Sequence, residues 1–263
     1  MSILIVQVHA EGIIFAADCH VTTVAQDGTT AQDYVWRKVM KWPRDEILLG
    51  YVGALEIGGQ PAHAWFESLR DEFRGIASLE EISRFLAEKV QNQRSKDEGS
   101  GPPNPLIIHL GGFVSREDLA VPEVWFVRNV YGLGHFGYRD CRKEFEQKEA
   151  FWGYFPDTQP SEIRDVLHVR AKQFDPFWFH QGTDLLTFNV LQSALDSSFK
   201  ALCQCHPRHE IPRTLEEWSK HARMKILMYG AYHEAFFPSD KQYVGGGSDV
   251  EFLPWPSETK GPK

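Results

Sequence analysis

The N-terminal part of the chain consists of short apolar runs separated by turn residues. Residues 3–8 are rich in Ile, Leu and Val, the dipeptide Glu11-Gly12 follows them, and residues 13–17 form a second apolar run. Two such runs joined by a tight turn predict a β-hairpin. A polar loop is predicted at 25–33, followed by strands at 34–42 and 47–52.

Two helical patterns come next. Residues 55–74 place Trp65, Leu69 and Phe73 four residues apart, which predicts one apolar helix face. A second helix is predicted to begin at Ser78, because Glu81 three residues later completes a capping box. The charged and then Gly/Pro-rich segment 95–104 predicts an exposed loop.

The second half of the chain repeats this order of strands followed by helices. Strands are predicted at 105–113, 121–128 and 177–180, helices at 185–203 and 215–236, and a Gly-rich bend with a last strand at 242–253. The stretch 131–176 has no clean period and is interpreted as an elaborated connection. Separate groups of strands and helices favour an α+β fold. We therefore expect one domain over 1–263, with a core at 1–253 and a tail at 254–263.

Composition excludes several classes of protein. The formal net charge of −8 offers no basic stripe for phosphate groups, so no nucleic-acid partner is expected. Four irregularly spaced cysteines do not form a disulfide framework, and a reducing, cytoplasmic location is the simpler interpretation. The N-terminus lacks the charged region of a signal peptide. No run approaches the roughly 20 apolar residues of a membrane span, so no membrane partner is expected.

Three motifs in the first 60 residues carry a resemblance to a known family. They are the run from Gly12 to Thr22 (GIIFAADCHVT), the run from Arg37 to Lys41 (RKVMK) and the run from Ile47 to Ala54 (ILLGYVGA). In this order they resemble proteasome β-type subunits of the N-terminal-nucleophile (Ntn) hydrolases, in particular the bacterial HslV-like type. The Gly-rich run 243–250 is similar to the turn before the family's last long strand. The resemblance implies a four-layer αββα sandwich of two antiparallel sheets covered by helices.

The resemblance also implies a set of catalytic residues. Counting back from Gly12, the nucleophile falls on Ser2, whose free amine after removal of Met1 would act as its general base. Lys38 matches the family lysine beside the nucleophile, and Asp18 matches the carboxylate that pairs with this lysine. Gly53 matches the glycine whose backbone N–H faces the developing oxyanion. Lys41 replaces Lys38 if the register is shifted.

The remaining site residues come from the same alignment. Gln181 stands where the family has a supporting serine, and Asp240 matches a supporting aspartate. The pocket for the substrate side chain is expected to be apolar and is predicted to be lined by Val21, Trp36, Tyr51 and Leu55. No cofactor and no metal is expected. The cluster Cys203, Cys205, His206 and His209 lacks the two separated ligand pairs of zinc sites, and a structural role is the simpler interpretation.

Three functions stay open at this point. The resemblance implies a peptidase or amidase that cleaves a peptide or protein substrate, forms a homo-oligomeric ring or spiral, and works with a possible ATPase unfoldase. A catalytically inactive assembly or interaction subunit would keep the fold and retain Met1. Ntn folds also host small-amide hydrolases, so the fold alone does not decide the substrate.

Overall fold

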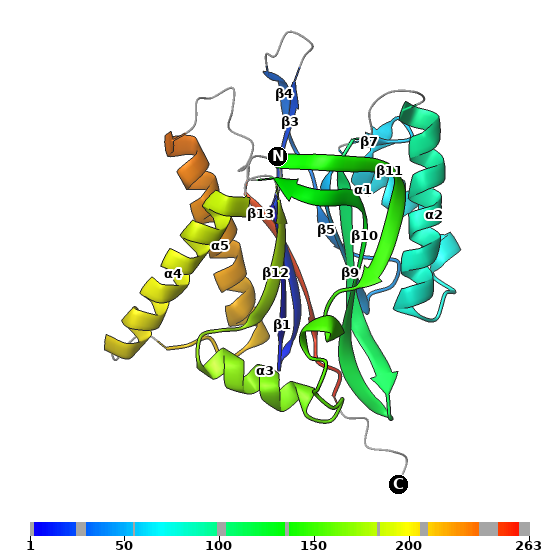
Figure 1. Ribbon diagram of the computed structural model, residues 1–263. Coiled ribbons are helices and arrows are strands. Elements are labelled where there is room, and N and C mark those ends of the chain that lie inside the picture. The colour runs from blue at the N-terminus through cyan, green and yellow to red at the C-terminus, as the bar shows by residue number, and fades with distance from the viewer. Residues whose placement is uncertain are drawn as a thin grey trace.

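Two antiparallel sheets packed face to face form the centre of the molecule (Figure 1). The computed structural model describes residues 3–24, 30–54, 56–98, 104–134, 137–182, 185–205, 210–236 and 247–257. Helices cover the outer face of each sheet, so the layers run helix, sheet, sheet, helix across Figure 1. The α+β class and the sandwich of two antiparallel sheets predicted from the sequence are confirmed.

The first sheet has the strand order β12-β1-β2-β13. Its strands are β1 (Ile3–His9), β2 (Gly12–Asp18), β12 (Phe177–Gly182) and β13 (Ser248–Pro254). The second sheet has the order β11-β10-β9-β6-β5. Its strands are β5 (Val39–Lys41), β6 (Ile47–Gly53), β9 (Leu106–Arg116), β10 (Leu119–Gly134) and β11 (Gly137–Glu149). Two small hairpins, β3 (His20–Val24) with β4 (Thr30–Val35) and β7 (Glu56–Ile57) with β8 (Gln60–Pro61), complete the strands described.

Both faces of the central strands are buried, which explains their nearly continuous apolar sequences. In β1, Leu4 and Val6 point between the two sheets, whereas Ile3 and Ile5 point towards the helices behind the first sheet. Alternate side chains of a strand lie on opposite faces, so apolar residues are favoured on both faces of a strand that is covered on both sides. The sequence pattern of β1 thus predicts a central strand of a layered fold.

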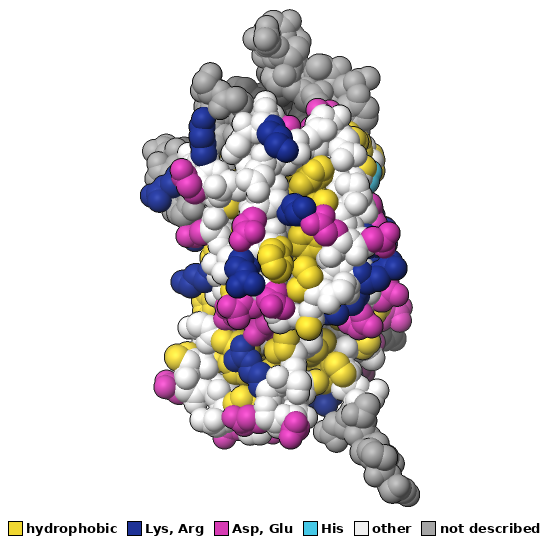
Figure 2. Space-filling view, turned by 90° about the vertical axis from the view of Figure 1, so that its right-hand side faces the viewer, with side chains coloured by type: hydrophobic (Ala, Val, Ile, Leu, Met, Phe, Trp, Pro, Cys, Tyr) yellow, Lys and Arg dark blue, Asp and Glu magenta, His cyan; other side chains and the backbone are white. Residues whose placement is uncertain are grey.

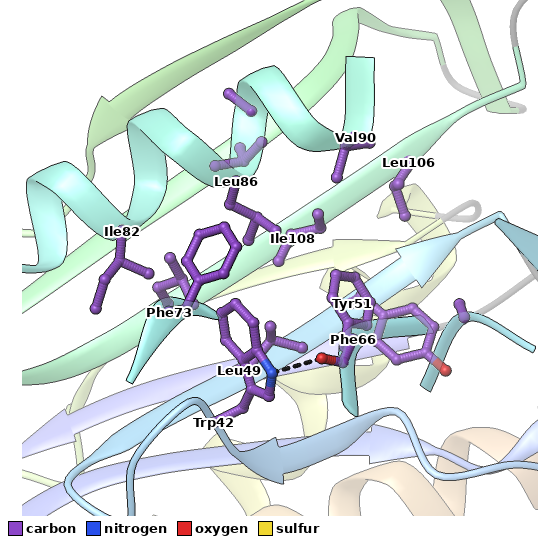
Figure 3. Packing of buried hydrophobic residues seen from close by; sticks show 14 of the residues in the cluster. Trp42, Leu49, Tyr51, Phe66, Phe73, Ile82, Leu86, Val90, Leu106 and Ile108 are labelled. Carbon is purple, nitrogen blue, oxygen red and sulfur yellow. Dashed lines mark hydrogen bonds between the residues drawn. The ribbon is translucent and has the colours of Figure 1, made fainter. Parts of the chain in front are cut away.

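One helical layer packs on the second sheet. It consists of α1 (Ala62–Phe73) and α2 (Leu79–Glu98). Trp42 and Phe73 fill the space beneath these helices, and the indole Nε1 of Trp42 donates to the Phe66 carbonyl oxygen at 2.7 Å (Figure 3). Figure 2 views this side of the molecule and shows acidic and basic side chains interspersed with apolar ones. The outer face of this layer therefore carries a mixture of charged and apolar side chains.

The other helical layer packs on the first sheet. It consists of α5 (Leu215–Phe236), which contacts β2 and β13, and α4 (Leu185–Cys205), which packs against α5. Trp218, Ala222, Ile226 and Tyr229 recur every three to four residues along α5 and face the sheet. A shorter helix, α3 (Ile163–Lys172), packs on β1 and β12 and follows a 3₁₀ turn, η1 (Trp152–Tyr154).

Capping residues and apolar periodicity correctly predict where α2 and α5 begin. Ser78 Oγ accepts a hydrogen bond from the Glu81 amide at 3.1 Å, and Thr214 and Glu217 form the reciprocal pair at the start of α5. These contacts satisfy amide groups that have no partner within the helix. The predicted helix at 215–236 coincides with α5, and the predicted hairpin at the N-terminus is the β1–β2 pair.

The structure differs from the sequence prediction in several places. Strand β4 begins at Thr30, inside the predicted loop 25–33, and α2 continues to Glu98, inside the predicted loop 95–104. The predicted strand 34–42 is interrupted, because β4 ends at Val35 and β5 begins at Val39. The helix predicted from residue 55 begins only at Ala62, after the β7–β8 hairpin. The stretch 131–176 contains β11, η1 and α3. Strand β11 forms the edge of its sheet, where a mostly charged sequence replaces the apolar alternation used to recognise strands.

We expect Phe15→Ala to lower the free energy of unfolding by about 3–5 kcal/mol, because it leaves a cavity between the sheets. Phe15 is fully buried, and its ring lies against Gly50 and Gly111 on the facing sheet. Urea unfolding measures the loss. The control Leu119→Ala, at a side chain that is 40% exposed, is expected to change stability little. A loss below about 1 kcal/mol for Phe15→Ala would contradict this packing.

Candidate active site

A buried carboxylate connects the N-terminal strand to the lysine predicted beside the nucleophile. Asp18 is the last residue of β2 and is fully buried. Its Oδ1 accepts the backbone N–H of Ile3 at 2.7 Å, and its Oδ2 lies 3.1 Å from Lys38 Nζ. Leu4 pairs with Ala17 in the β1–β2 ladder. The hydrogen bond from the Ile3 N–H to the Asp18 carboxylate holds the two strands together at the next position. Asp18 therefore fixes both the start of β1 and the ammonium group.

Lys38 is buried as deeply as its partner. Its side chain is 2% exposed, and it lies in the short segment between β4 and β5. The Lys38 carbonyl accepts the Tyr51 N–H at 3.0 Å, which attaches this segment to β6. A charge removed from water in this way is stable only when paired. The structure places Lys38 Nζ beside Asp18, which is the contact that the resemblance implies, and it leaves Lys41 at the end of β5.

Gly53 ends β6 in a conformation that favours glycine. Its φ is +108°, and a Cβ built on it would lie 2.2 Å from the Pro105 carbonyl oxygen. Both the backbone angle and the close approach exclude a side chain at this position. A glycine is thus required here by the fold itself, whatever further role its N–H has.

Several predicted residues cannot be placed. Ser2, Leu55 and Asp240 lie outside the described residues. Val21 and Gln181 are described only in their backbone, where Val21 pairs with Tyr34 and Gln181 pairs with Leu4. The second pairing places the backbone of Gln181 near the start of β1.

Two residues of the predicted substrate pocket have described side chains. Tyr51 is 3% exposed and packs against Phe66 in the core, and its hydroxyl donates to the Arg37 carbonyl at 2.9 Å. Burial raises the pKa of the Tyr51 hydroxyl above its usual range. Trp36 is partly buried, and its ring centroid lies 5.8 Å from that of His63. Of these two side chains, Trp36 is the one with surface to offer a ligand.

Two residues near Lys38 were missed by the sequence analysis. Asp249 of β13 accepts the backbone N–H groups of Lys38 and Val39, at 3.1 and 3.0 Å. Cys19 follows Asp18, and burial together with the negative charge of Asp249 raises the pKa of its thiol to about 11. Asp249 lies in the Gly-rich run 243–250, but only the pairing of β13 with β2 reveals which residue of that run faces the lysine.

A second cluster of buried polar groups lies between the first sheet and α4–α5. Lys225 Nζ lies 2.7 Å from Asp196 Oδ1, and His221 Nε2 lies 3.9 Å from the same oxygen. Nearby, the His9 ring lies in a tilted contact with Trp218, with 4.6 Å between the ring centroids. Burial is the main cause that lowers the pKa of His9 and of His221 to about 3, with the charge of Lys225 as the second cause.

The described side chains include no group of three His, Cys, Asp or Glu residues arranged to hold a metal ion. His206 and His209 of the Cys/His cluster lie outside the described residues. Among the helices described, none combines the length and apolar character needed to cross a bilayer.

Comparison with known proteins gives a likeness in structure only. Neither a family model nor a curated protein matches the chain. Anbu (ancestral beta-subunit) from Yersinia bercovieri matches with 14% sequence identity and a TM-score of 0.49, over 96% of this chain and 81% of that chain. A Gly-1 mutant of Anbu from Hyphomicrobium sp. strain MC1 matches with 14% identity and a TM-score of 0.48, over 97% and 82%. Likeness at this level carries no argument about activity or assembly.

The comparison corrects one expectation. The HslV-like assignment is wrong: the solved structures named above that match the chain are ancestral beta-subunit proteins and not HslV. The three motifs behind the HslV-like assignment correspond to the β1–β2 hairpin, the segment around Lys38, and strand β6 with the turn that follows it. These elements build the sandwich, and by themselves they do not identify a family.

We expect Asp18→Asn to destabilise the protein by about 3–5 kcal/mol, because Lys38 then remains buried without the carboxylate opposite it. The amide keeps an oxygen for the Ile3 N–H, so the variant isolates the effect of charge. Combining it with Lys38→Met is expected to recover most of the loss in urea unfolding. Equal stability of the single and double variants would contradict a coupled buried pair.

We expect stability to fall as the pH falls below about 6.5, the usual histidine pKa. His9 and His221 titrate near 3 when folded, so between about 3 and 6.5 the unfolded chain binds more protons. Each histidine then contributes a slope of up to about 1.4 kcal/mol per pH unit. Urea unfolding at pH 7.5, 6 and 5 measures it, and His221→Gln should reduce the slope. A flat profile from pH 7.5 to 5 would be incompatible with these pKa values.

Proposed function

We propose that the chain is a proteasome-like Ntn hydrolase that cleaves peptide or amide bonds, with Ser2 as its N-terminal nucleophile once Met1 is removed. The supporting observation is the double role of Asp18. This carboxylate holds the N–H of Ile3, the residue after Ser2, and at the same time holds the Lys38 ammonium. The backbone N–H of the residue that follows Ser2 is thereby linked, through Asp18, to a buried positive charge.

The proposed chemistry assigns each group a separate task. The Ser2 hydroxyl oxygen attacks the substrate carbonyl carbon, and its proton passes to the free α-amine of the same residue. The amine then protonates the leaving amine, which leaves a seryl ester for water to hydrolyse. The positive charge of Lys38 favours the alkoxide, and like-charge repulsion favours the neutral amine. The Gly53 N–H stabilises the oxyanion.

Substrate selection is proposed to depend on an apolar pocket. Val21, Trp36 and Leu55 line it in this proposal, and Tyr51 supports it from the core, where its side chain is packed. Gln181 and Asp240 are proposed to support the nucleophile. An apolar pocket of this kind disfavours charged side chains, because burying an unpaired charge is costly.

The protein is proposed to work as a cytoplasmic homo-oligomer, a ring or spiral that encloses its active sites and receives peptide or protein substrates. An ATPase unfoldase that delivers them is a further proposed partner. Support comes from the outer surface of α4 and α5, where large apolar side chains are exposed. These are Val190, Leu202, Leu227, Met228 and Phe236. Large apolar side chains exposed on one pair of packed helices are what a contact surface between subunits would use.

The test is an intact mass of the protein from its native host, with and without a β-lactone directed at serine and threonine nucleophiles. The expected species lacks Met1 and gains one adduct on Ser2. Ser2→Ala should abolish the adduct and keep the assembly. Cys19→Ala is the matched control and should keep the adduct, since the raised pKa of its thiol leaves little reactive thiolate at neutral pH.

The other outcomes identify the competing functions. A full-length protein that does not react with the lactone contradicts the proposal and supports an inactive assembly or interaction subunit. A processed, reactive protein that hydrolyses small amides but not peptides supports a small-amide hydrolase on the same site.

A further inference from the structure

The last strand of the first sheet holds the backbone that carries Lys38. Asp249 Oδ2 accepts two backbone N–H groups, from Lys38 at 3.1 Å and from Val39 at 3.0 Å. Two amide donors that converge on one carboxylate oxygen fix the orientation of the peptide group between them. The orientation of that peptide group sets the direction in which the Lys38 side chain leaves the backbone.

A second carboxylate on the same strand holds the neighbouring residue. Glu251 Oε1 lies 2.5 Å from Arg37 Nη2, and Arg37 Nε donates to the Val39 carbonyl at 3.0 Å. Asp249 and Glu251 are two residues apart in a strand and therefore lie on the same face. Strand β13 thus contacts segment 37–39 through both carboxylates.

The Lys38 and Val39 amides need the support of Asp249, because the strand that begins at Val39 is weak. Strand β5 has three residues and lies at the edge of its sheet, so only β6 pairs with it. Few ladder hydrogen bonds hold so short an edge strand, whereas the catalytic geometry requires a fixed lysine.

The two aspartates act on different parts of the same lysine. Strand β13 pairs with β2 so that Ser248 lies opposite Asp18 and Asp249 lies opposite Ala17. Asp18 binds the ammonium group, and Asp249 binds the backbone N–H. The negative charge of Asp249 also reaches the neighbouring Cys19, where it is the second cause of the raised thiol pKa.

We propose that Asp249 is a positioning residue that orients Lys38 towards Asp18 through the two backbone hydrogen bonds. This inference rests on the proposed function for its catalytic consequence, whereas the orientation of Lys38 can be measured without any activity. Asp249 does not touch substrate in this proposal. It acts through Lys38.

The experiment compares Asp249→Ala and Asp249→Asn with Glu251→Gln as the matched control. Glu251→Gln removes the ion pair with Arg37 and leaves both N–H bonds to Asp249 intact. The first readout is amide hydrogen exchange at Lys38 and Val39, together with acylation of the Lys38 amine by a water-soluble reagent. Loss of hydrogen bonds to a charged acceptor is expected to speed exchange and acylation at least about tenfold in Asp249→Ala. Asp249→Asn, which keeps a neutral acceptor, should lie between this variant and the control.

The second readout is the rate of β-lactone addition to Ser2 as a function of pH. We expect Asp249→Ala to slow addition by about tenfold or more and to shift its pH profile, because the charge beside the α-amine is displaced. Glu251→Gln should keep the parent profile. A merely structural loss would lower the amount of folded protein without moving the pH profile.

The outcomes distinguish the positioning role of Asp249 from the proposed function of the protein. Unchanged exchange and acylation at Lys38 in a folded Asp249→Ala protein overturn the positioning role. A parent protein that never reacts with the lactone overturns the proposed function, while the exchange readout still decides the role of Asp249. If Asp249→Ala does not fold, Asp249→Asn decides in its place, and parent-like exchange together with a parent-like pH profile overturns the inference.

Discussion

The candidate site depends on one buried ion pair, the Asp18 carboxylate with the Lys38 ammonium. Each charge would be costly in the interior without the other. The carboxylate has a second oxygen, and it uses this oxygen to hold the backbone of Ile3. One side chain therefore joins the first strand of one sheet to the segment that precedes an edge strand of the other sheet.

The layered fold brings these groups together from distant parts of the chain. Asp18 ends a strand of the first sheet, Lys38 precedes a strand of the second, and their ion pair joins the two sheets at this point. Strand β13 returns from the far end of the sequence to pair with β2 and supplies Asp249 to the backbone of Lys38. The close packing of Phe15 against the glycines of the facing sheet keeps the layers near enough for these contacts.

Local sequence patterns were enough to predict the elements in which apolar residues mark the buried faces and capping residues mark the ends. The β1–β2 hairpin is apolar on both faces, and α5 has both a capping box and an apolar stripe. Strand β11 was missed because an edge strand with a charged sequence has no such pattern. The Asp18–Lys38 pair could be predicted because both residues lie in recognisable motifs. Asp249 could not, because its role follows from the register between two strands more than 200 residues apart in sequence.

The most direct test of this account is a crystal structure of the processed protein after reaction with a β-lactone. The account predicts an ester on Ser2 Oγ, the Lys38 ammonium within hydrogen-bond distance of that oxygen, and Asp18 still bound to both the Ile3 N–H and Lys38. An adduct on another residue, or a Lys38 side chain turned away from Ser2 with the Asp18 contacts broken, would contradict it.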